Sequence, residues 1–358
     1  MLGDSFLPPI QFTLQPQNPT NEITSRLQLA VAGGGARAKL AEHNKALPVD
    51  RVYASYNHFH NAAQRGSFAF GPGPAIGGSR SVDRFTLGLE RTLQDGRSSL
   101  EVRLPLTSYP DLGGSFPGFG PNAVFSTDTG TLGNLSLVGK RLLLSADDLT
   151  VSAGLGVEVP VGDDAWAQSG NFVFHVENQA VYLQPFLAAT LDNGSTFVHS
   201  FLQVDIEANA NPLRVQINGL GSFGPPSPGG PTPGGPPFEN IGRLDQPTLI
   251  HWDTSIGHWL ARSDDDRGIT GIAAIAEFHL TASASDSERV GGTLPSDSGP
   301  IDFLSQSGRQ FPATYFTTGL HVEISRDTTL RVAGVFPLAS SQRRLFDSEV
   351  LVQIGRRY

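Results

Sequence analysis

The chain has 358 residues, of which 39% are apolar and 16% charged; this composition argues against a wholly disordered protein and allows one large domain or two smaller ones. The net charge of −9, without a basic cluster, makes nucleic acid a poor partner, because a phosphate backbone is bound by clustered Lys and Arg. With no cysteine, the chain has no disulfide, no thiolate metal site and no cysteine nucleophile.

Uninterrupted apolar stretches are short, such as Ile272 to Ala276. A helix needs about 18 apolar residues to span a bilayer, so no transmembrane helix is expected. The first residues, Met1 to Phe6, hold neither a basic region nor an apolar one, so no secretory signal is expected in this sequence.

Residues 1–48 differ in pattern from the rest of the chain. Pro8, Pro9, Pro16, Pro19 and the Gly33-Gly34-Gly35 run break any long strand in this segment. We therefore predict that residues 1–48 lie outside the array of strands that follows.

From residue 49 onward the dominant pattern is strict alternation of apolar and polar residues, which is typical of a strand with two different faces. In the clearest case, Leu149 to Val161, every odd position is apolar and the even positions are Thr, Ser, Gly or Glu up to Glu158. Similar stripes recur at Phe85/Leu87/Leu89, Leu100/Val102/Leu104/Leu106, Val198/Leu202/Val204/Ile206, Ile272/Ala274/Ala276/Phe278/Leu280, Phe316/Leu320/Val322/Ile324, Leu330/Val332/Phe336 and Val350/Val352/Ile354.

The connections between these strands alternate between two kinds. Five are short and rich in Asp, Asn, Gly or Ser, which supply the backbone conformations of tight hairpins: residues 94–97, 145–148, 192–194, 262–268 and 325–327. Six are longer: residues 61–79, 107–131, 162–178, 208–246, 282–311 and 339–346. Twelve strands result, from 49–60 to 347–358, with all short turns on one side. The Pro/Gly tract Gly219 to Pro237 is then the tip of the fourth long loop rather than a linker, and residues 49–358 form one domain.

This arrangement predicts an all-β fold, a transmembrane antiparallel up-and-down β-barrel of about 12 strands in the cell outer membrane. The strands are longer than those of most soluble sheets, and charged residues lie deep within them. Inside a bilayer every backbone group needs a partner, which permits a sheet only if it closes on itself. The apolar stripes then face lipid and the polar stripes face an enclosed lumen. Residues 1–48 become a periplasmic segment or a plug inside this lumen. A soluble, secreted β-sandwich remains an alternative, because its strands also alternate.

The inward-facing stripes supply the candidate pore-lining residues. Their acids outnumber their bases slightly, which predicts a mild preference for cations or neutral solutes. The candidates are Arg84, Glu90, Glu101, Arg103, Glu158, His199, Asp205, Glu207, His251, Asp253, Glu277, His279, His321, Glu323 and Arg331.

A sequence motif covers Glu42 to Asn61, at and just before the first predicted strand. Pro48, Asp50, Arg51, Val52, Tyr56, Asn57 and Phe59 fit the pattern E-N-x-x-P-x-P-x-D-R-V-x-x-x-Y-N-x-F, whereas His43 interrupts the Glu-Asn pair and Ala46 stands at the earlier proline. In this stretch the chain resembles predicted outer-membrane β-barrels of Planctomycetes-type bacteria. The resemblance implies a barrel fold and an outer-membrane location. The segment before the barrel is also loosely similar to that of the fatty-acid and aromatic-hydrocarbon channels of outer membranes.

No constellation for catalysis stands out, so we predict that the chain is not an enzyme and that it needs no cofactor. A G-x-S-x-G elbow does not occur. The His-x-Glu pair His321/Glu323 and the Glu-x-His pair Glu277/His279 share a face, but without a third fixed ligand we predict no metal site. Trp252, Trp259, Tyr315 and Phe336 are candidates for the aromatic belts at the membrane interfaces, with ordinary core packing as the alternative.

We therefore predict an outer-membrane channel for passive passage of small solutes. The alternative is a closed structural or binding barrel that acts through its long extracellular loops. The expected partners are outer-membrane lipid, small solutes and, through a terminal strand ending at Tyr358, the barrel assembly machinery. The identity of the solute and the oligomeric state remain open.

Overall fold

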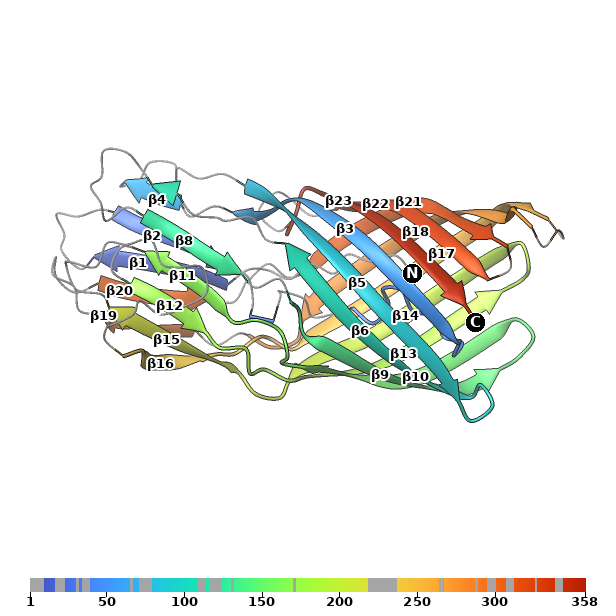
Figure 1. Ribbon diagram of the computed structural model, residues 1–358, viewed down its shortest axis with the longest axis horizontal. Coiled ribbons are helices and arrows are strands. Elements are labelled where there is room, and N and C mark those ends of the chain that lie inside the picture. The colour runs from blue at the N-terminus through green and yellow to red at the C-terminus, as the bar shows by residue number, and fades with distance from the viewer. Residues whose placement is uncertain are drawn as a thin grey trace.

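The computed structural model describes residues 10–16, 23–29, 32–33, 39–64, 67–70, 79–108, 114–115, 124–129, 132–169, 172–217, 237–263, 265, 267–286, 289–294, 301–306, 312–325, 327–338 and 344–358. Twelve antiparallel strands form a closed barrel (Figure 1). In chain order they are β3 (Arg51–Gln64), β5 (Ser79–Leu93), β6 (Ser98–Ser108), β9 (Leu135–Ser145), β10 (Leu149–Val159), β13 (Tyr182–Asp192), β14 (Thr196–Glu207), β17 (Leu249–Arg262), β18 (Ile269–Ser283), β21 (Ala313–Ile324), β22 (Thr328–Pro337) and β23 (Ser348–Arg357).

The barrel closes where its last strand meets its first. Strand β23 pairs with β3 in a register that runs from Ser348 opposite His60 to Arg357 opposite Arg51. Each other barrel strand pairs with its sequential barrel neighbours, so the sheet has no free edge. The predicted number of strands and their up-and-down order are therefore confirmed.

Tight turns join the strands at one end of the barrel. Gln94, Asp95 and Gly96 all have positive φ angles, of 53°, 55° and 80°, and this is the conformation that the Asp-Gly pair predicted. Gly194 likewise has a φ of 88° in the turn between β13 and β14.

The two faces of the barrel wall differ as the alternation predicted. On β13, for example, Leu183, Leu187 and Leu191 are exposed on the outside, whereas Gln184 is fully buried on the inside. The outward apolar side chains form a band that suits hydrocarbon, and the inward face is rich in buried charged and polar groups. A closed sheet with this distribution is the architecture of outer-membrane barrels, and the chain is such a barrel. The described residues contain no helix that is long and apolar enough to span a bilayer.

Beyond the long-loop end of the barrel lie two further sheets, called the head here (Figure 1, left). One sheet orders β19 (Arg289–Leu294), β20 (Ile301–Gln306), β1 (Ile10–Pro16), β2 (Ile23–Leu29) and β4 (Ser67–Phe70). The other orders β16 (Glu239–Leu244), β15 (Asn211–Ile217), β12 (Phe172–Val176), β11 (Ala165–Ser169), β8 (Val124–Thr129) and β7 (Gly114–Ser115). Strands of both sheets contribute to one apolar core, which includes Phe174, Leu213 and Leu294.

The head contains strands that the sequence patterns did not predict. Segments interpreted as long loops contain strands, and β1 and β2, from within residues 1–48, pair with them rather than with the barrel. Most of the Pro/Gly tract, residues 219–236, lies outside the described residues. The division of the chain at residue 48 remains a prediction.

Candidate functional site

The fifteen candidate lining residues all lie on the inward face of the barrel wall. Twelve of them are buried, while His199, Glu207 and Glu323 are partly exposed. Their role in lining a pore stays a prediction.

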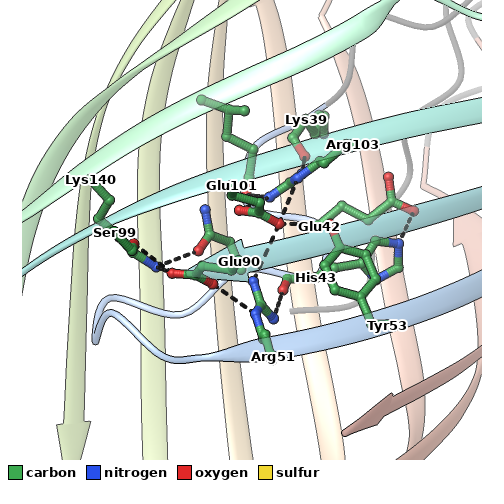
Figure 2. A network of polar contacts seen from close by, with 12 residues as sticks. Lys39, Glu42, His43, Arg51, Tyr53, Glu90, Ser99, Glu101, Arg103 and Lys140 are labelled. Carbon is green, nitrogen blue, oxygen red and sulfur yellow. Dashed lines mark hydrogen bonds and ion pairs between the residues drawn. The ribbon is translucent and has the colours of Figure 1, made fainter. Parts of the chain in front are cut away.

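Residues 39–48 lie inside the barrel, against one side of its wall (Figure 2). The segment forms a tight turn, in which the amide of Glu42 donates to the carbonyl of Lys39 at 3.1 Å. On β6, the Arg103 guanidinium donates to the carbonyls of Lys39 and Leu40 at 3.3 and 3.2 Å. The cationic side chain of the wall thus binds backbone carbonyls of the turn, the Lys39 carbonyl in addition to its bond within the turn.

The same wall binds the second half of the segment. On β9, Lys140 Nζ donates to the side-chain oxygen of Asn44 at 2.9 Å and to the carbonyl of Lys45 at 2.8 Å. On β3, the Arg51 guanidinium donates to the carbonyl of His43. The segment is therefore held along most of its length through its backbone.

Contacts with a distant part of the wall show that the segment bridges the lumen. The amide of Leu40 donates to Oε1 of Gln203 on β14 at 2.7 Å. Lys39 Nζ lies 3.3 Å from the carboxylate of Asp253 on β17. These strands are separated from β6 in the barrel order by β9, β10 and β13, so residues 39–48 connect two separate parts of the wall.

Glu101 is the centre of the polar network in Figure 2. Its carboxylate accepts a hydrogen bond from the Tyr53 hydroxyl at 2.7 Å, lies 2.9 Å from Nε of Arg103 and 3.4 Å from a guanidinium nitrogen of Arg51. Arg51 also pairs with Glu90 at 2.7 Å. Buried charges are tolerated only when they are paired and hydrogen-bonded, and this network meets that condition.

Gly88 on β5 leaves space for one side chain of this network, Tyr53. A Cβ on Gly88 would lie 2.1 Å from the ring of Tyr53, so this ring crosses β5 only because position 88 has no side chain. The crossing brings the Tyr53 hydroxyl to Glu101.

Pairs of histidine and acid occupy the opposite part of the wall. His251 Nε2 lies 3.1 Å from the carboxylate of Asp205, and His279 Nδ1 lies 2.8 Å from that of Asp253. Within the part of the chain that the structure describes, no group of three or more His, Asp or Glu side chains is placed to hold a metal ion.

Aromatic and aliphatic side chains fill the lumen near the long loops. The ring of Phe346, from the loop after β22, lies 5.4 Å from that of Phe59 and stacks on that of Tyr315 at 4.9 Å between centroids. Leu345 beside it is also buried in this cluster. Leu345 and Phe346, just before β23, thus pack inward at this end of the lumen.

For two of the four aromatic residues that are candidates for the membrane belts, this prediction is wrong. Trp252 and Phe336 are each 49% exposed on the outer face, but Tyr315 is only 2% exposed inside the barrel and Trp259 lines a pocket of the lumen. The reason is strand parity: Trp259 occupies an odd position of β17, as Asp253 does, and its aromatic character does not override this position.

Several residues of the network were missed in the sequence. Arg51 was noted only as part of a motif, although it alternates with Val52 in the same way as the other inward charges. Lys39, Glu42 and Lys45 carry no periodic signal, because residues 39–48 are not a strand; only the folded chain places them in the lumen.

No family model matches the sequence, and no curated protein matches it. Among solved structures, an outer membrane channel from Pseudomonas putida F1 is 12% identical, with a TM-score of 0.48 over 88% of this chain and 97% of that chain. The toluene transporter TbuX of Ralstonia pickettii is 12% identical, with a TM-score of 0.41 over 91% of this chain and 97% of that chain.

The translocator domain of the autotransporter NalP from Neisseria meningitidis is 11% identical, with a TM-score of 0.46 over 88% of this chain and 90% of that chain. Identities and TM-scores this low assign neither a family nor a substrate. They do not confirm the resemblance to the Planctomycetes-type family, and the barrel assignment rests on the strand pairing of the chain itself.

Proposed function

We propose that this outer-membrane barrel is a channel for small solutes that residues 39–48 hold closed, and that passage requires this segment to shift within the lumen. The observation that carries the proposal is the nature of the contacts. The segment is held mainly by hydrogen bonds and ion pairs from wall residues such as Arg103 and Lys140.

Such contacts favour a movable closure. A hydrogen bond to a charged group is exchanged for one to water at a net cost of about 1.5–3 kcal/mol, so these contacts can be replaced one at a time as water enters. The apolar contacts of the segment are fewer: Leu40, Ala41 and Ala46 pack in a cluster with wall residues that include Phe186 and Phe201.

A second candidate is favoured by the head. Its strands build their own apolar core beyond the barrel, which is more than a channel rim requires. In this alternative the barrel is a permanently closed anchor and the head binds other surface components.

Single-channel recording in planar bilayers tests the proposal with one matched pair of variants. Lys140→Met removes the donor to Asn44 and Lys45 together with the ion pair to Glu90 at 2.9 Å. Arg141→Met removes a charge from the neighbouring, exposed position of the same strand. We expect rare openings in the unmodified protein, a much higher open probability in Lys140→Met, and no change in Arg141→Met.

A single thiol gives an independent measurement. The chain has no cysteine and Ala46 is fully buried, so Ala46→Cys reports when the segment leaves its site. We expect a hydrophilic thiol reagent to modify it faster in the Lys140→Met background. Absence of current from folded protein of both kinds would favour the closed anchor. Steady conductance while the thiol introduced at position 46 stays unreactive would show that the segment is not the gate.

A further inference from the structure

A pocket of about 240 Å³ lies in the lumen toward the short-turn end and opens there between exposed residues such as Arg262 and Arg357. Its lining comes from strand ends next to the short turns and from Lys45 of the luminal segment. Sites for drug-sized ligands usually enclose about 300–1,000 Å³, so an occupant of this cavity is a smaller molecule.

Three cations of the lining have no carboxylate partner. Among the described residues, no carboxylate lies within ion-pair distance of Lys45, Arg331 or Arg357. Arg331 instead donates to Nδ1 of His321 at 3.0 Å and to Oε1 of Gln353 at 3.4 Å. This differs from the central network, where the carboxylates of the wall are matched by cations.

The balance of charge on the lining is positive. Arg262 adds a fourth cation, against the two acids Asp192 and Glu323. Basic side chains therefore crowd together in this space. A bound anion would relieve this repulsion.

Aromatic rings form the other part of the lining. Phe197 and Trp259 lie with their ring centroids 5.8 Å apart, and Ile275 packs in the same cluster. Indole Nε1 of Trp259 is buried without a hydrogen-bond partner, so it is available to an acceptor. These side chains offer an apolar surface beside the cations, and the Arg262 guanidinium lies over the Trp259 ring at 4.4 Å from its centroid.

We propose that this cavity binds a small organic carboxylate with a flat apolar body, held between the cations Lys45, Arg331 and Arg357 and the rings of Phe197 and Trp259. The inference deepens the proposed channel function, on which it rests, by naming a solute class. It also differs from the mild preference for cations that the excess of lining acids predicted, because the central carboxylates are occupied in ion pairs.

Calorimetric titration of the full chain in detergent with benzoate tests the inference, with benzamide as the neutral comparison. We expect benzoate to bind at least about tenfold more tightly than benzamide, since a charge-assisted hydrogen bond contributes roughly one order of magnitude or more in affinity. Two neighbouring positions of β23 give the matched variants. Arg357→Gln, at the cavity, weakens benzoate binding by about tenfold, whereas Arg356→Gln, on the outer face, leaves it unchanged.

The variants are accepted only if their gel mobility still changes on heating, as for a folded barrel. Equal binding of benzoate and benzamide, equal effects of the two arginine variants, or no benzoate binding to folded protein would each overturn the inference. Because binding is measured without current, the two proposals fail separately. Binding without conductance would support this site and contradict the proposed channel. Conductance without binding would support the channel and contradict this site.

Discussion

The barrel and the head each bury one face of their sheets, but they bury opposite faces: the apolar face in the head and the polar face in the barrel. In the head, apolar side chains such as Phe174 and Leu213 are fully buried between strands. In the barrel, Leu187 is 51% exposed on the outer face, while Glu101 is buried inside.

The difference shows that the surroundings decide which face of an alternating strand is buried. Water drives apolar side chains together in the head. Hydrocarbon removes that driving force from the outer wall of the barrel, so the apolar face turns outward and the interior is held by paired charges instead. Stability in the two regions therefore depends on different residue types.

The largest effect is expected from breaking the central network of the barrel. Glu101→Leu leaves the guanidiniums of Arg51 and Arg103 without this carboxylate. We expect a loss of about 5 kcal/mol, the upper end for breaking a buried pair, because two cations lose a partner. Denaturant unfolding of the vesicle-inserted protein measures this loss. Glu101→Gln keeps an acceptor for Tyr53 and should cost less; equal losses would argue against a charge effect.

A cavity in the apolar core of the head should cost somewhat less and stay local. Phe174→Ala is expected to destabilise the head by about 3–4 kcal/mol, the lower part of the usual range for truncating a buried Phe. Limited proteolysis should then cut the head strands, while the heat-dependent gel mobility of the barrel is retained. Loss of both together would mean that the head and the barrel unfold as one unit.

A charge on the lipid face tests the inversion directly. Leu187→Arg, near the middle of β13, is expected to cost about 2–4 kcal/mol, whereas Leu191→Arg, on the same face at the strand end, should cost at most about 1 kcal/mol. The dependence on depth is the diagnostic feature. Equal costs at both positions, measured by unfolding from vesicles, would show that this face does not contact the hydrocarbon core.

The smallest effect is expected at an exposed ion pair on the rim. Arg91 lies 3.7 Å from Asp50, and its side chain is 63% exposed. Asp50 also accepts hydrogen bonds from the backbone amide and hydroxyl of Thr92, which lower its pKa and remain when Arg91 is removed. Arg91→Ala should therefore leave the unfolding midpoint unchanged within error. A clear shift would show that rim charges contribute as buried ones do.

Alternation predicted the wall of the barrel well because parity is a local property. The positions of Glu101, Arg103 and Glu277 on the inward face follow from counting along a strand. The same count places Trp259 and Tyr315 inside, and they were mispredicted only where residue type was used in place of position. The inward position of Arg51 also follows from counting odd and even positions along its strand, but it was not predicted.

The head strands were not predicted because their partners are distant in the sequence. Strand β1 pairs with β20, nearly 300 positions along the chain, and β12 with β15 across two barrel strands. Short segments such as Phe172–Val176 hold too few residues for their alternation to stand out, and only their mutual packing stabilises them.

The sequence alone determined that the chain forms a barrel of twelve long strands with its apolar face outward. The reason is that side-chain direction in a strand depends only on odd and even position. Tertiary structure alone decided what occupies the enclosed space. The backbone of residues 39–48 is bound there by Arg103, Lys140 and Gln203, whose contacts depend on the barrel having closed. Contacts between remote segments leave no period in a sequence, so the contents of the lumen were set by packing and charge pairing.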